Sequence, residues 1–463
     1  MLTVLAATAA ISVPAANASF TAPYDHRCSG ASITGLGSSA QRSAQDAFHA
    51  FWRTNVTTRK TSGCGPASKK YVGYQVLPTA GPGAGSWSGF TGLGGYARFY
   101  GSDDAPTLAQ RGAIEQRASH HGPAVLQTVP VAQTAQAVIV NFPKNCELRA
   151  GDPNLASYAR FKVPGATLVK MWFGDAAYDT WGELLPGIKA TPNTSRTDQS
   201  CRSVQIVRVM PGSLFSGAHV LLSVAASLQF GVTAGLHGIY NPLFVNDANP
   251  ISVAQVVAKL SGSIAVVGLP AARAAGFQKA PDTAPSGSEY VYQGVNQQRN
   301  YPAFGNRYSF KQQRFWIPLE AADGAGNPTG SYLEPTFNRV SIRNGQRGAN
   351  CRDVPYANVP LDAQGKIDVR GDWSKVTATR AANRYPLCVL SYVSFWDDYS
   401  DVYANSKREQ ANARTVRDYL TTTLYSGQHT LFKKDYTPLS WSPAQNLRFV
   451  GQRAILRSNW LKP

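Results

Sequence analysis

The sequence predicts an α/β protein built of two lobes. The chain has 463 residues, which is more than one hydrophobic core usually accommodates. Short β-branched or aromatic runs alternate with segments whose apolar residues recur at helical spacing. This alternation is typical of lobes in which helices cover a sheet. The hydrophobic content of 43% is that of a globular protein, not of a disordered or multispan membrane chain.

The first predicted unit is a strand, a glycine-serine turn and a helix in "ITGLGSSAQRSAQDAFHAFW". The helix is indicated by apolar residues at helical spacing: Ala44, Phe48, Phe51 and Trp52. The free amides at its start, with Ser38 and Ser39, could bind an anion. An ordinary N-cap serine explains the same residues equally well.

Further turns of the same kind follow. "YVGYQVLPTAGPGAGSWSGFTG" places Ser86 and Ser88 after a short strand, and "CRSVQIVRVMPGSLFSGAHVLLSVAAS" places a small-residue turn between a strand and an apolar helix. The spacing in the first of these stretches fits neither a phosphate loop nor a dinucleotide fingerprint. Ligands of α/β sheets bind at the carboxyl ends of strands. Such turns, gathered there, predict a site rich in N–H and O–H donors for an oxyanion.

Two extended segments connect the predicted lobes. Residues 125–143, "VLQTVPVAQTAQAVIVNFP", read as chain crossing from the first lobe to the second. "GSIAVVGLPAARAAGF" reads as a buried strand and a short helix that return the chain to the first lobe. Residues 279–313 are polar and rich in Pro, Gly and Gln, which predicts an exposed loop.

The chain is strongly basic, with a net charge of +18. This charge favours anionic partners, although a basic solvated surface explains it as well. A nucleic-acid or polyanion binder is permitted by the charge and the 11% aromatic content. However, no basic stripe alternates with aromatic residues, and no recognition motif occurs. We therefore expect no nucleic-acid partner.

The N-terminus predicts export. Residues 1–18 are apolar and end in Ala16-Asn17-Ala18, the pattern of a signal-peptide cleavage site. Pro14 argues against the alternative of a buried first helix. We expect a mature chain that begins near Ser19 in the periplasm or outside the cell.

The even number of cysteines suggests disulfides in an exported chain. The six are Cys28, Cys64, Cys146, Cys201, Cys351 and Cys388. We favour the sequential pairs 28–64, 146–201 and 351–388, because each closes a loop within one segment. Buried free thiols are the alternative. Neither a C-x-x-C motif nor zinc spacing occurs, so no metal is expected.

Catalytic motifs are missing from the sequence. None of the seven histidines belongs to an H-E-x-x-H motif, and no G-x-S-x-G elbow occurs. His120 and His121 lie in a polar stretch and read as a surface pair. We expect a protein that is not an enzyme and has no cofactor.

Taken together, several motifs resemble the phosphate-specific substrate-binding proteins of bacterial ABC importers, a branch of the type II periplasmic binding proteins. The likeness is closest to secreted actinobacterial-type members. It runs from about Ile33 to Leu439 and is carried by the order of these segments: "ITGLGSSAQ", "GAGSWSG", "FYGSDDAP", "LQTVPVAQTAQAVIVNFP", "GSIAVVGL", "RGDWSKV", "RYPLCVLSYV" and "GQHTLFKKDYTPL". The resemblance implies two α/β lobes with a hinge and a ligand cleft between them.

The resemblance also implies ligand-binding residues in the first lobe. Ser39 aligns with a hydroxyl of the first turn, and Ala40 with its neighbour that offers a backbone N–H. Ser86 aligns with the serine of the second turn. Asp104 aligns with the aspartate that accepts a hydrogen bond from the protonated oxygen of the phosphate, at the family's eighteen-residue interval from Ser86. Asp103 is interpreted as a turn or cap residue.

The second-lobe motif departs from the family pattern R-x-D-x-S-G-T. In "RVMPGSLFSGAH", Ser216 and Gly217 can stand for its Ser and Gly, with Ala218 in the Thr position. The family's arginine falls near Pro211. Arg208 is the nearby cation that would have to serve instead, through a shifted loop.

An aspartate beside an oxyanion predicts selectivity. The ionised Asp104 cannot donate a hydrogen bond, so the ligand must supply the proton. Hydrogen phosphate has one near neutral pH and sulfate has none. A buried acceptor left unpaired costs about 1–3 kcal/mol, which disfavours sulfate.

These inferences predict an exported binding protein that delivers phosphate, or a similar oxyanion, to an ABC permease and its ATPase. A monomer is expected. Lobe 1 comprises residues 19–128 and 263–463, and lobe 2 comprises 129–262. One alternative is a binding protein whose pocket has drifted to another anion, or a surface adhesin. The other, which the resemblance implies, is a phosphatase-like enzyme on the same scaffold.

Overall fold

The computed structural model describes most of the chain in fifteen segments. These are residues 32–55, 71–77, 87–92, 95–148, 152–154, 161–173, 176–192, 194–211, 242–245, 250–277, 314–325, 327–336, 348–380, 384–440 and 447–460. Several predictions fall outside them: the signal peptide, the Cys28–Cys64 pair, Ser86, Ser216, Gly217 and the loop 279–313.

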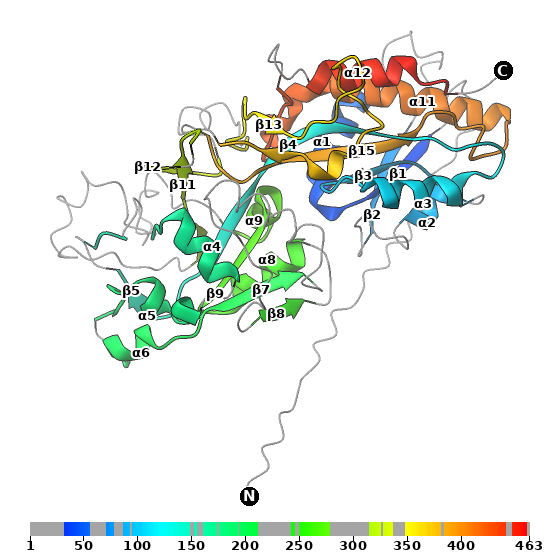
Figure 1. Ribbon diagram of the computed structural model, residues 1–463. Coiled ribbons are helices and arrows are strands. Elements are labelled where there is room, and N and C mark those ends of the chain that lie inside the picture. The colour runs from blue at the N-terminus through cyan, green and yellow to red at the C-terminus, as the bar shows by residue number, and fades with distance from the viewer. Residues whose placement is uncertain are drawn as a thin grey trace, which may run out of the picture.

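One sheet runs through both halves of the molecule (Figure 1). Its main path, in spatial order, is β2 (Val72–Val76), β1 (Ile33–Gly37), β3 (Ala97–Ser102), β15 (Cys388–Trp396), β4 (Leu126–Asn141), β9 (Ser263–Gly268), β7 (Val207–Pro211) and β8 (Pro242–Val245). Two short strands, β10 (Arg314–Trp316) and β16 (Tyr436–Thr437), also pair with β4. Strands β2, β1 and β3 are parallel to one another, as are β8, β7 and β9.

Strand β4 belongs to both lobes. Residues 126–135 pair with β15, and residues 136–141 pair with β9. All but one of its sixteen residues are buried. Figure 1 shows β4 leaving the sheet of the first lobe and continuing into the second. The crossing segment expected from the sequence is thus a single long strand.

Helices cover the sheet in each lobe (Figure 1). The first lobe has η1 (Ser39–Gln41), α1 (Arg42–Asn55), α2 (Ser88–Thr91), α3 (Leu108–Ala118), α11 (Lys407–Leu424), η9 (Ser426–Lys433) and α12 (Leu447–Arg457). The second has α4 (Gly165–Phe173), η5 (Ala176–Tyr178), α5 (Trp181–Leu184), α6 (Asp198–Arg202), α8 (Pro250–Lys259) and α9 (Leu269–Ala274). No helix within the described segments is long and apolar enough to cross a membrane.

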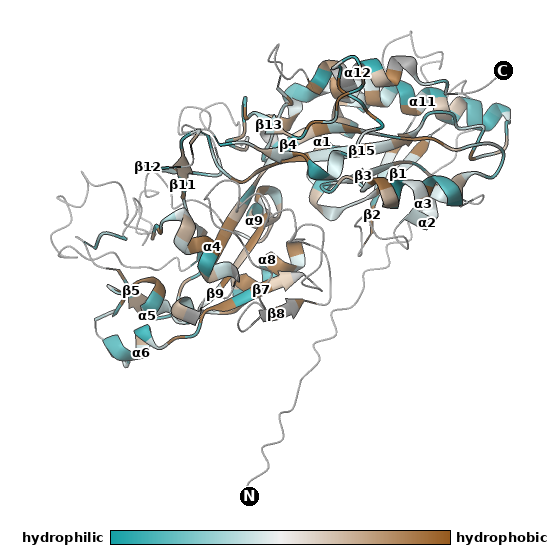
Figure 2. Cartoon of the chain, viewed as in Figure 1, coloured by the Kyte–Doolittle hydropathy of each residue, from teal (hydrophilic) through white to brown (hydrophobic). Residues whose placement is uncertain are grey.

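Short antiparallel pairs complete the fold. They are β5 (Cys146–Glu147) with β6 (Lys189–Ala190), β11 (Leu319–Ala322) with β12 (Pro328–Leu333), and β13 (Tyr356–Ala357) with β14 (Thr377–Ala378). A 3-10 turn, η8 (Trp373–Lys375), precedes β14. Figure 2 shows hydrophobic residues along β9 and hydrophilic ones over α6.

A buried ion pair fixes α11 to the sheet. Arg98 of β3 donates from Nε and Nη2 to the two carboxylate oxygens of Glu409, at 2.8 and 2.7 Å. The guanidinium also lies 4.1 Å from the ring centre of Tyr403. Because both oxygens are satisfied, the buried charges compensate each other, and removing one partner would leave the other unpaired.

A second ion pair connects α9 with the segment before β16. Arg273 Nε donates to Asp435 Oδ1 at 2.6 Å. The Arg273 guanidinium lies 5.3 Å from the ring centre of Trp316, on β10. Asp435 is buried, and its carbonyl accepts a hydrogen bond from Thr134 of β4. The pair therefore lies beside the strand that the two lobes share.

This architecture confirms the α/β class and the two lobes expected from the sequence. The strand expected to return the chain to the first lobe, β9, pairs instead with β7 and with the far half of β4. Its residues therefore belong to the sheet of the second lobe. The exact limits of the two lobes stay a prediction.

Two of the expected disulfides are formed, Cys146–Cys201 and Cys351–Cys388. The first joins β5 to α6, and the second joins the segment before β13 to the start of β15. Each closes a loop within one segment, as the sequential pairing requires.

Removing the second disulfide should lower stability. We expect the double variant Cys351→Ala/Cys388→Ala to lose about 2–4 kcal/mol of unfolding free energy, because the unfolded chain gains the entropy of a reopened loop. Urea unfolding of wild type and variant measures this loss. A reductant should lower the wild-type midpoint toward that of the variant. Equal midpoints without reductant would contradict the prediction.

Candidate anion-binding site

The first serine turn lies where β1 and β3 end side by side. Gly37 has φ of 150°, and a Cβ there would lie 1.9 Å from the carbonyl oxygen of Gly101. Only glycine fits such a close approach. The next amide, Ser38 N–H, donates to that same carbonyl at 2.8 Å. The end of β3 is thereby joined to the turn that opens α1.

Ser38 is the capping residue of this turn. Its Oγ accepts from the Ala40 N–H at 3.1 Å, which confirms the N-cap interpretation for Ser38. The Ala40 amide that the resemblance assigns to the ligand is thus engaged by Ser38. Ser39, the next residue, is buried.

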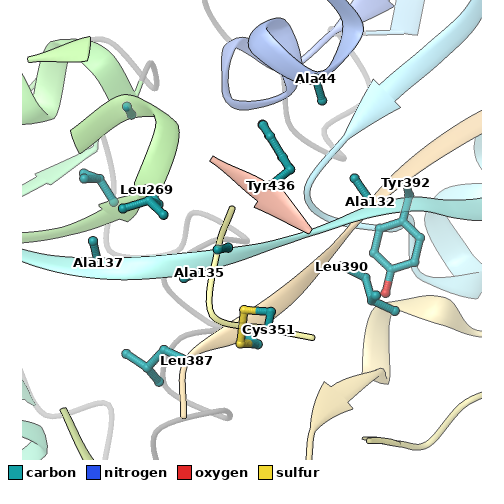
Figure 3. Packing of buried hydrophobic residues seen from close by; sticks show 14 of the residues in the cluster. Ala44, Ala132, Ala135, Ala137, Leu269, Cys351, Leu387, Leu390, Tyr392 and Tyr436 are labelled. Atoms are coloured by element: carbon teal, nitrogen blue, oxygen red, sulfur yellow. A yellow bond between two sulfur atoms is a disulfide. The ribbon is translucent and has the colours of Figure 1, made fainter. Parts of the chain in front are cut away.

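Three side chains hold the turn in place through partners that are distant in sequence. Gln41, fully buried, donates from Nε2 to the carbonyls of Ser102 and Tyr392 at 2.9 and 2.6 Å. The Tyr74 hydroxyl donates to the Ser38 carbonyl at 2.9 Å. The Tyr436 hydroxyl donates to the Ala40 carbonyl. Figure 3 shows Tyr436 between Ala44 and strand β4.

The acid pair follows β3 directly. Asp103 accepts a hydrogen bond from the Ser391 hydroxyl of β15. The Asp104 N–H donates to Ser102 Oγ at 3.1 Å. Both acidic side chains are only partly exposed. Asp104 and the Ser39 turn therefore lie at the same edge of the sheet, as the sequence predicts.

The pKa values of both acids lie above the ordinary value for aspartate. Burial raises the pKa of Asp103 to about 6, against the opposing effect of the Ser391 hydrogen bond. Burial, and then the charge of Asp103, raise the pKa of Asp104 to about 7. Low solvation and a like-charged neighbour both disfavour the ionised form.

A small pocket borders Asp103. Its lining includes Ala105, Trp373, Thr377, Leu390 and Tyr392. The Trp373 and Tyr392 rings meet edge to face, 5.9 Å apart. The buried Thr377 hydroxyl has no hydrogen-bond partner among the described residues. A mostly apolar pocket with a few polar groups can orient a small ligand.

Arg208 lies elsewhere, in the packing of the second lobe. It is fully buried, and its guanidinium donates to the carbonyls of Met171 and Tyr178 at 2.7 and 2.9 Å. Asp179 lies 3.7 Å away. Burial lowers the pKa of Arg208, against the opposing charge of Asp179. These contacts favour a role in packing α4 and η5 against β7, and its role as a ligand donor stays a prediction.

Sequence reasoning missed the residues that support the turn. Gln41 belongs to the turn itself and bonds to the end of β3, Tyr74 and Tyr436 reach the turn from β2 and β16, and Ser391 of β15 reaches Asp103. No short motif marks them, because each acts through a partner far away in sequence. Within the described segments, no group of three or more His, Cys, Asp or Glu side chains could hold a metal ion.

No family model and no curated protein matches the chain. Solved structures do match at low identity. A high-affinity periplasmic phosphate-binding protein, PfluDING, is 12% identical, with 93% of this chain and 99% of that one covered and a TM-score of 0.49. A phosphate-binding protein from Stenotrophomonas maltophilia is 12% identical, with 91% and 93% covered and a TM-score of 0.48. An ABC-type phosphate transport receptor from Vibrio cholerae is 11% identical, with 88% and 100% covered and a TM-score of 0.37. Likeness at this level carries no conclusion about what this chain binds.

The raised pKa of Asp104 predicts a pH-dependent stability. The folded protein holds a proton that the unfolded chain releases above its ordinary pKa of 3.8. The free energy of unfolding should therefore fall as pH rises from about 4 to about 7, and level off above. Asp104→Asn removes this loss, so the variant should be about 1 kcal/mol more stable than wild type at pH 8.

Urea unfolding at pH 4.5, 6 and 8 measures the difference, which should shrink at the lowest pH. Asp46→Asn, at an exposed position on α1, is the matched control and should show no such trend. A variant less stable than wild type at pH 8 would refute the account of Asp104.

The contacts of Arg208 predict a loss of stability on truncation. Arg208→Ala removes the buried partner of two carbonyls and of Asp179. It should lower the free energy of unfolding by about 3–5 kcal/mol. The control is Arg202→Ala, at an exposed position on α6. Thermal unfolding measures both. The opposite outcome would be an unchanged stability with a ten- to hundredfold loss of oxyanion affinity, which is about the effect of one charge-assisted hydrogen bond. That outcome would show that Arg208 binds the ligand.

Proposed function

We propose that the chain is an exported binding protein for inorganic phosphate or a closely similar oxyanion. One observation carries the proposal. A turn that opens a helix lies beside a partly buried carboxylate pair, at the carboxyl ends of two adjacent parallel strands. Ligands of α/β proteins bind at such edges, where helix starts offer N–H donors.

The acid pair restricts the class of ligand. An ionised carboxylate can only accept hydrogen bonds, so it tolerates an anion that carries its own proton. Hydrogen phosphate and hydrogen arsenate carry one near neutral pH, and sulfate does not. The pair thus supports selectivity for a protonated tetrahedral oxyanion rather than for anions in general.

The two lobes supply a means of closure. They share β4, so bending or twisting of that strand can bring the lobes together around a bound ligand, as in hinge-bending receptors. Donors from the second lobe would complete the site. Ser216 and Gly217 remain the proposed donors there, and Ser86 in the first lobe, all outside the described residues.

Export and delivery complete the proposed function. Two disulfides support an oxidising compartment outside the cytoplasm. We propose that residues 1–18 direct export. The closed, monomeric receptor would then present its ligand to an ABC permease and its ATPase.

A drifted pocket is the second candidate function. The contacts of Arg208 favour packing over ligand binding. The cation that the family pattern requires is then missing from the described part of the site. The ligand would in that case be another small anion.

Calorimetry with phosphate, arsenate and sulfate at pH 7.5 tests the proposal. We expect phosphate and arsenate to bind and sulfate to bind about a hundredfold more weakly, which is the effect of one unpaired charged acceptor. The double variant Asp103→Asn/Asp104→Asn should reduce this gap, because an amide can also donate. Asp46→Asn is the control.

Two results would count against phosphate binding. If none of the three oxyanions binds, the drifted pocket becomes the better explanation. Release of p-nitrophenol from its phosphate ester by wild type would support the phosphatase-like alternative.

A further inference from the structure

We infer that Arg273 and Asp435 are positioning residues for the first turn, and that their ion pair couples the arrangement of the two lobes to the candidate anion-binding site. The inference rests on the proposed function and adds a means of control to it. Arg273 lies on α9, which directly follows β9 of the second lobe. Asp435 directly precedes β16, which pairs with the first-lobe half of β4. The lobes are thus joined by side chains as well as by their shared strand.

The ion pair is largely shielded from water. Arg273 Nε donates to Asp435 Oδ1 at 2.6 Å. The Asp435 side chain is 8% exposed and that of Arg273 is 26% exposed. The guanidinium also lies 5.3 Å from the ring centre of Trp316, which is buried. Charge-assisted hydrogen bonds of this kind are short and strong, so Arg273 restricts where the Asp435 carboxylate can lie.

The backbone of Asp435 has a conformation that few residues adopt. Its φ is 64°, in the left-handed region that favours glycine and, less strongly, asparagine and aspartate. Such a conformation persists where the surrounding structure holds it. The contacts that hold Asp435 include the ion pair and the hydrogen bond from the Thr134 hydroxyl to its carbonyl, at 3.3 Å. Loss of the ion pair would therefore weaken the hold on the residue that directs the chain into β16.

The next residue, Tyr436, transmits the effect to the first turn. It is fully buried, and its hydroxyl donates to the Ala40 carbonyl. The Ala40 N–H donates to Ser38 Oγ at 3.1 Å, so both backbone groups of Ala40 are engaged, one within the turn and one from β16. Figure 3 shows Tyr436 between Leu269 of α9 and Ala44 of α1. A displaced Tyr436 would lose its hydrogen bond or move the turn.

The second lobe meets the same turn at another point. Helix α8 lies against η1, which is part of the turn, and α8 also packs against α9. Any rotation of the second lobe about β4 therefore changes the contact of α8 with the turn and the Arg273–Asp435 contact together. The ion pair thus lets the turn respond to the position of the other lobe.

A double-mutant cycle tests the coupling by calorimetry with inorganic phosphate at pH 7.5. Arg273→Gln removes the charge and should weaken phosphate binding about three- to thirtyfold, the range expected of residues that act through an intermediate element. Tyr436→Phe removes the hydroxyl that holds the Ala40 carbonyl. In that background Arg273→Gln should change the affinity by less than about twofold, because the connection to the turn is already broken.

Substitutions at Asp435 separate its charge from its backbone conformation. Asp435→Asn removes the charge and keeps a side chain that tolerates the left-handed region. Asp435→Gly removes the side chain and suits the same backbone conformation. Both should weaken phosphate binding, the glycine variant more, because an amide oxygen can still accept from Arg273. Variants that lower the urea midpoint and leave phosphate affinity unchanged would show a merely structural pair and would overturn the inference.

Arg370→Gln is the matched control. Arg370 also pairs with a buried aspartate, Asp397, at 3.4 Å. That aspartate follows the end of β15 that pairs with the start of β4, away from the first turn. The control should therefore leave phosphate affinity within about twofold of wild type.

The outcomes separate this inference from the proposed function. Wild type that binds phosphate, with Arg273→Gln equal to it in affinity, would overturn only the inference. Losses that add up in the double variant would do the same, because they would show that Arg273 acts on the ligand without Tyr436. Wild type that binds none of phosphate, arsenate and sulfate would overturn both.

Discussion

The fold depends on one constraint: a single strand serves both lobes. β4 uses one half of its length to pair with β15 and the other half to pair with β9. Its backbone groups are satisfied across the junction, so the lobes are joined by a hydrogen-bonded ladder rather than by a flexible linker. The almost complete burial of β4 includes polar side chains, such as Gln133 and Thr134, which donate hydrogen bonds to the carbonyls of Pro438 and Asp435. Any motion between the lobes must therefore twist this ladder.

The candidate site depends on a second, local constraint. The backbones of Gly37 and Gly101 approach too closely for a side chain, which brings the first turn and the acid pair to the same edge. Gln41, Tyr74 and Tyr436 then hold the turn by its carbonyls and neighbouring strands.

Local patterns predicted the strands, the crossing segment and the first turn, because periodicity and glycine placement act over a few residues. The two disulfide pairs of the described segments were also predicted, since short loops favour sequential pairing. The contacts that orient the acids could not be predicted. Ser391 reaches Asp103 across 288 positions, and Tyr436 reaches Ala40 across 396. For the same reason, the sequence around Arg208 does not predict that its guanidinium donates hydrogen bonds to the carbonyls of Met171 and Tyr178.

The Arg273–Asp435 ion pair gives the protein a built-in optical reporter. The guanidinium of Arg273 lies near the indole of Trp316, and its partner Asp435 directly precedes Tyr436, which holds the first turn. A shift of α9 relative to β10 changes the distance between the Arg273 charge and the Trp316 indole. Indole emission responds to such a change in local field. The part of the intrinsic fluorescence that is lost in a Trp316→Phe variant therefore follows the relative position of these elements without any attached label, although the chain has nine tryptophans.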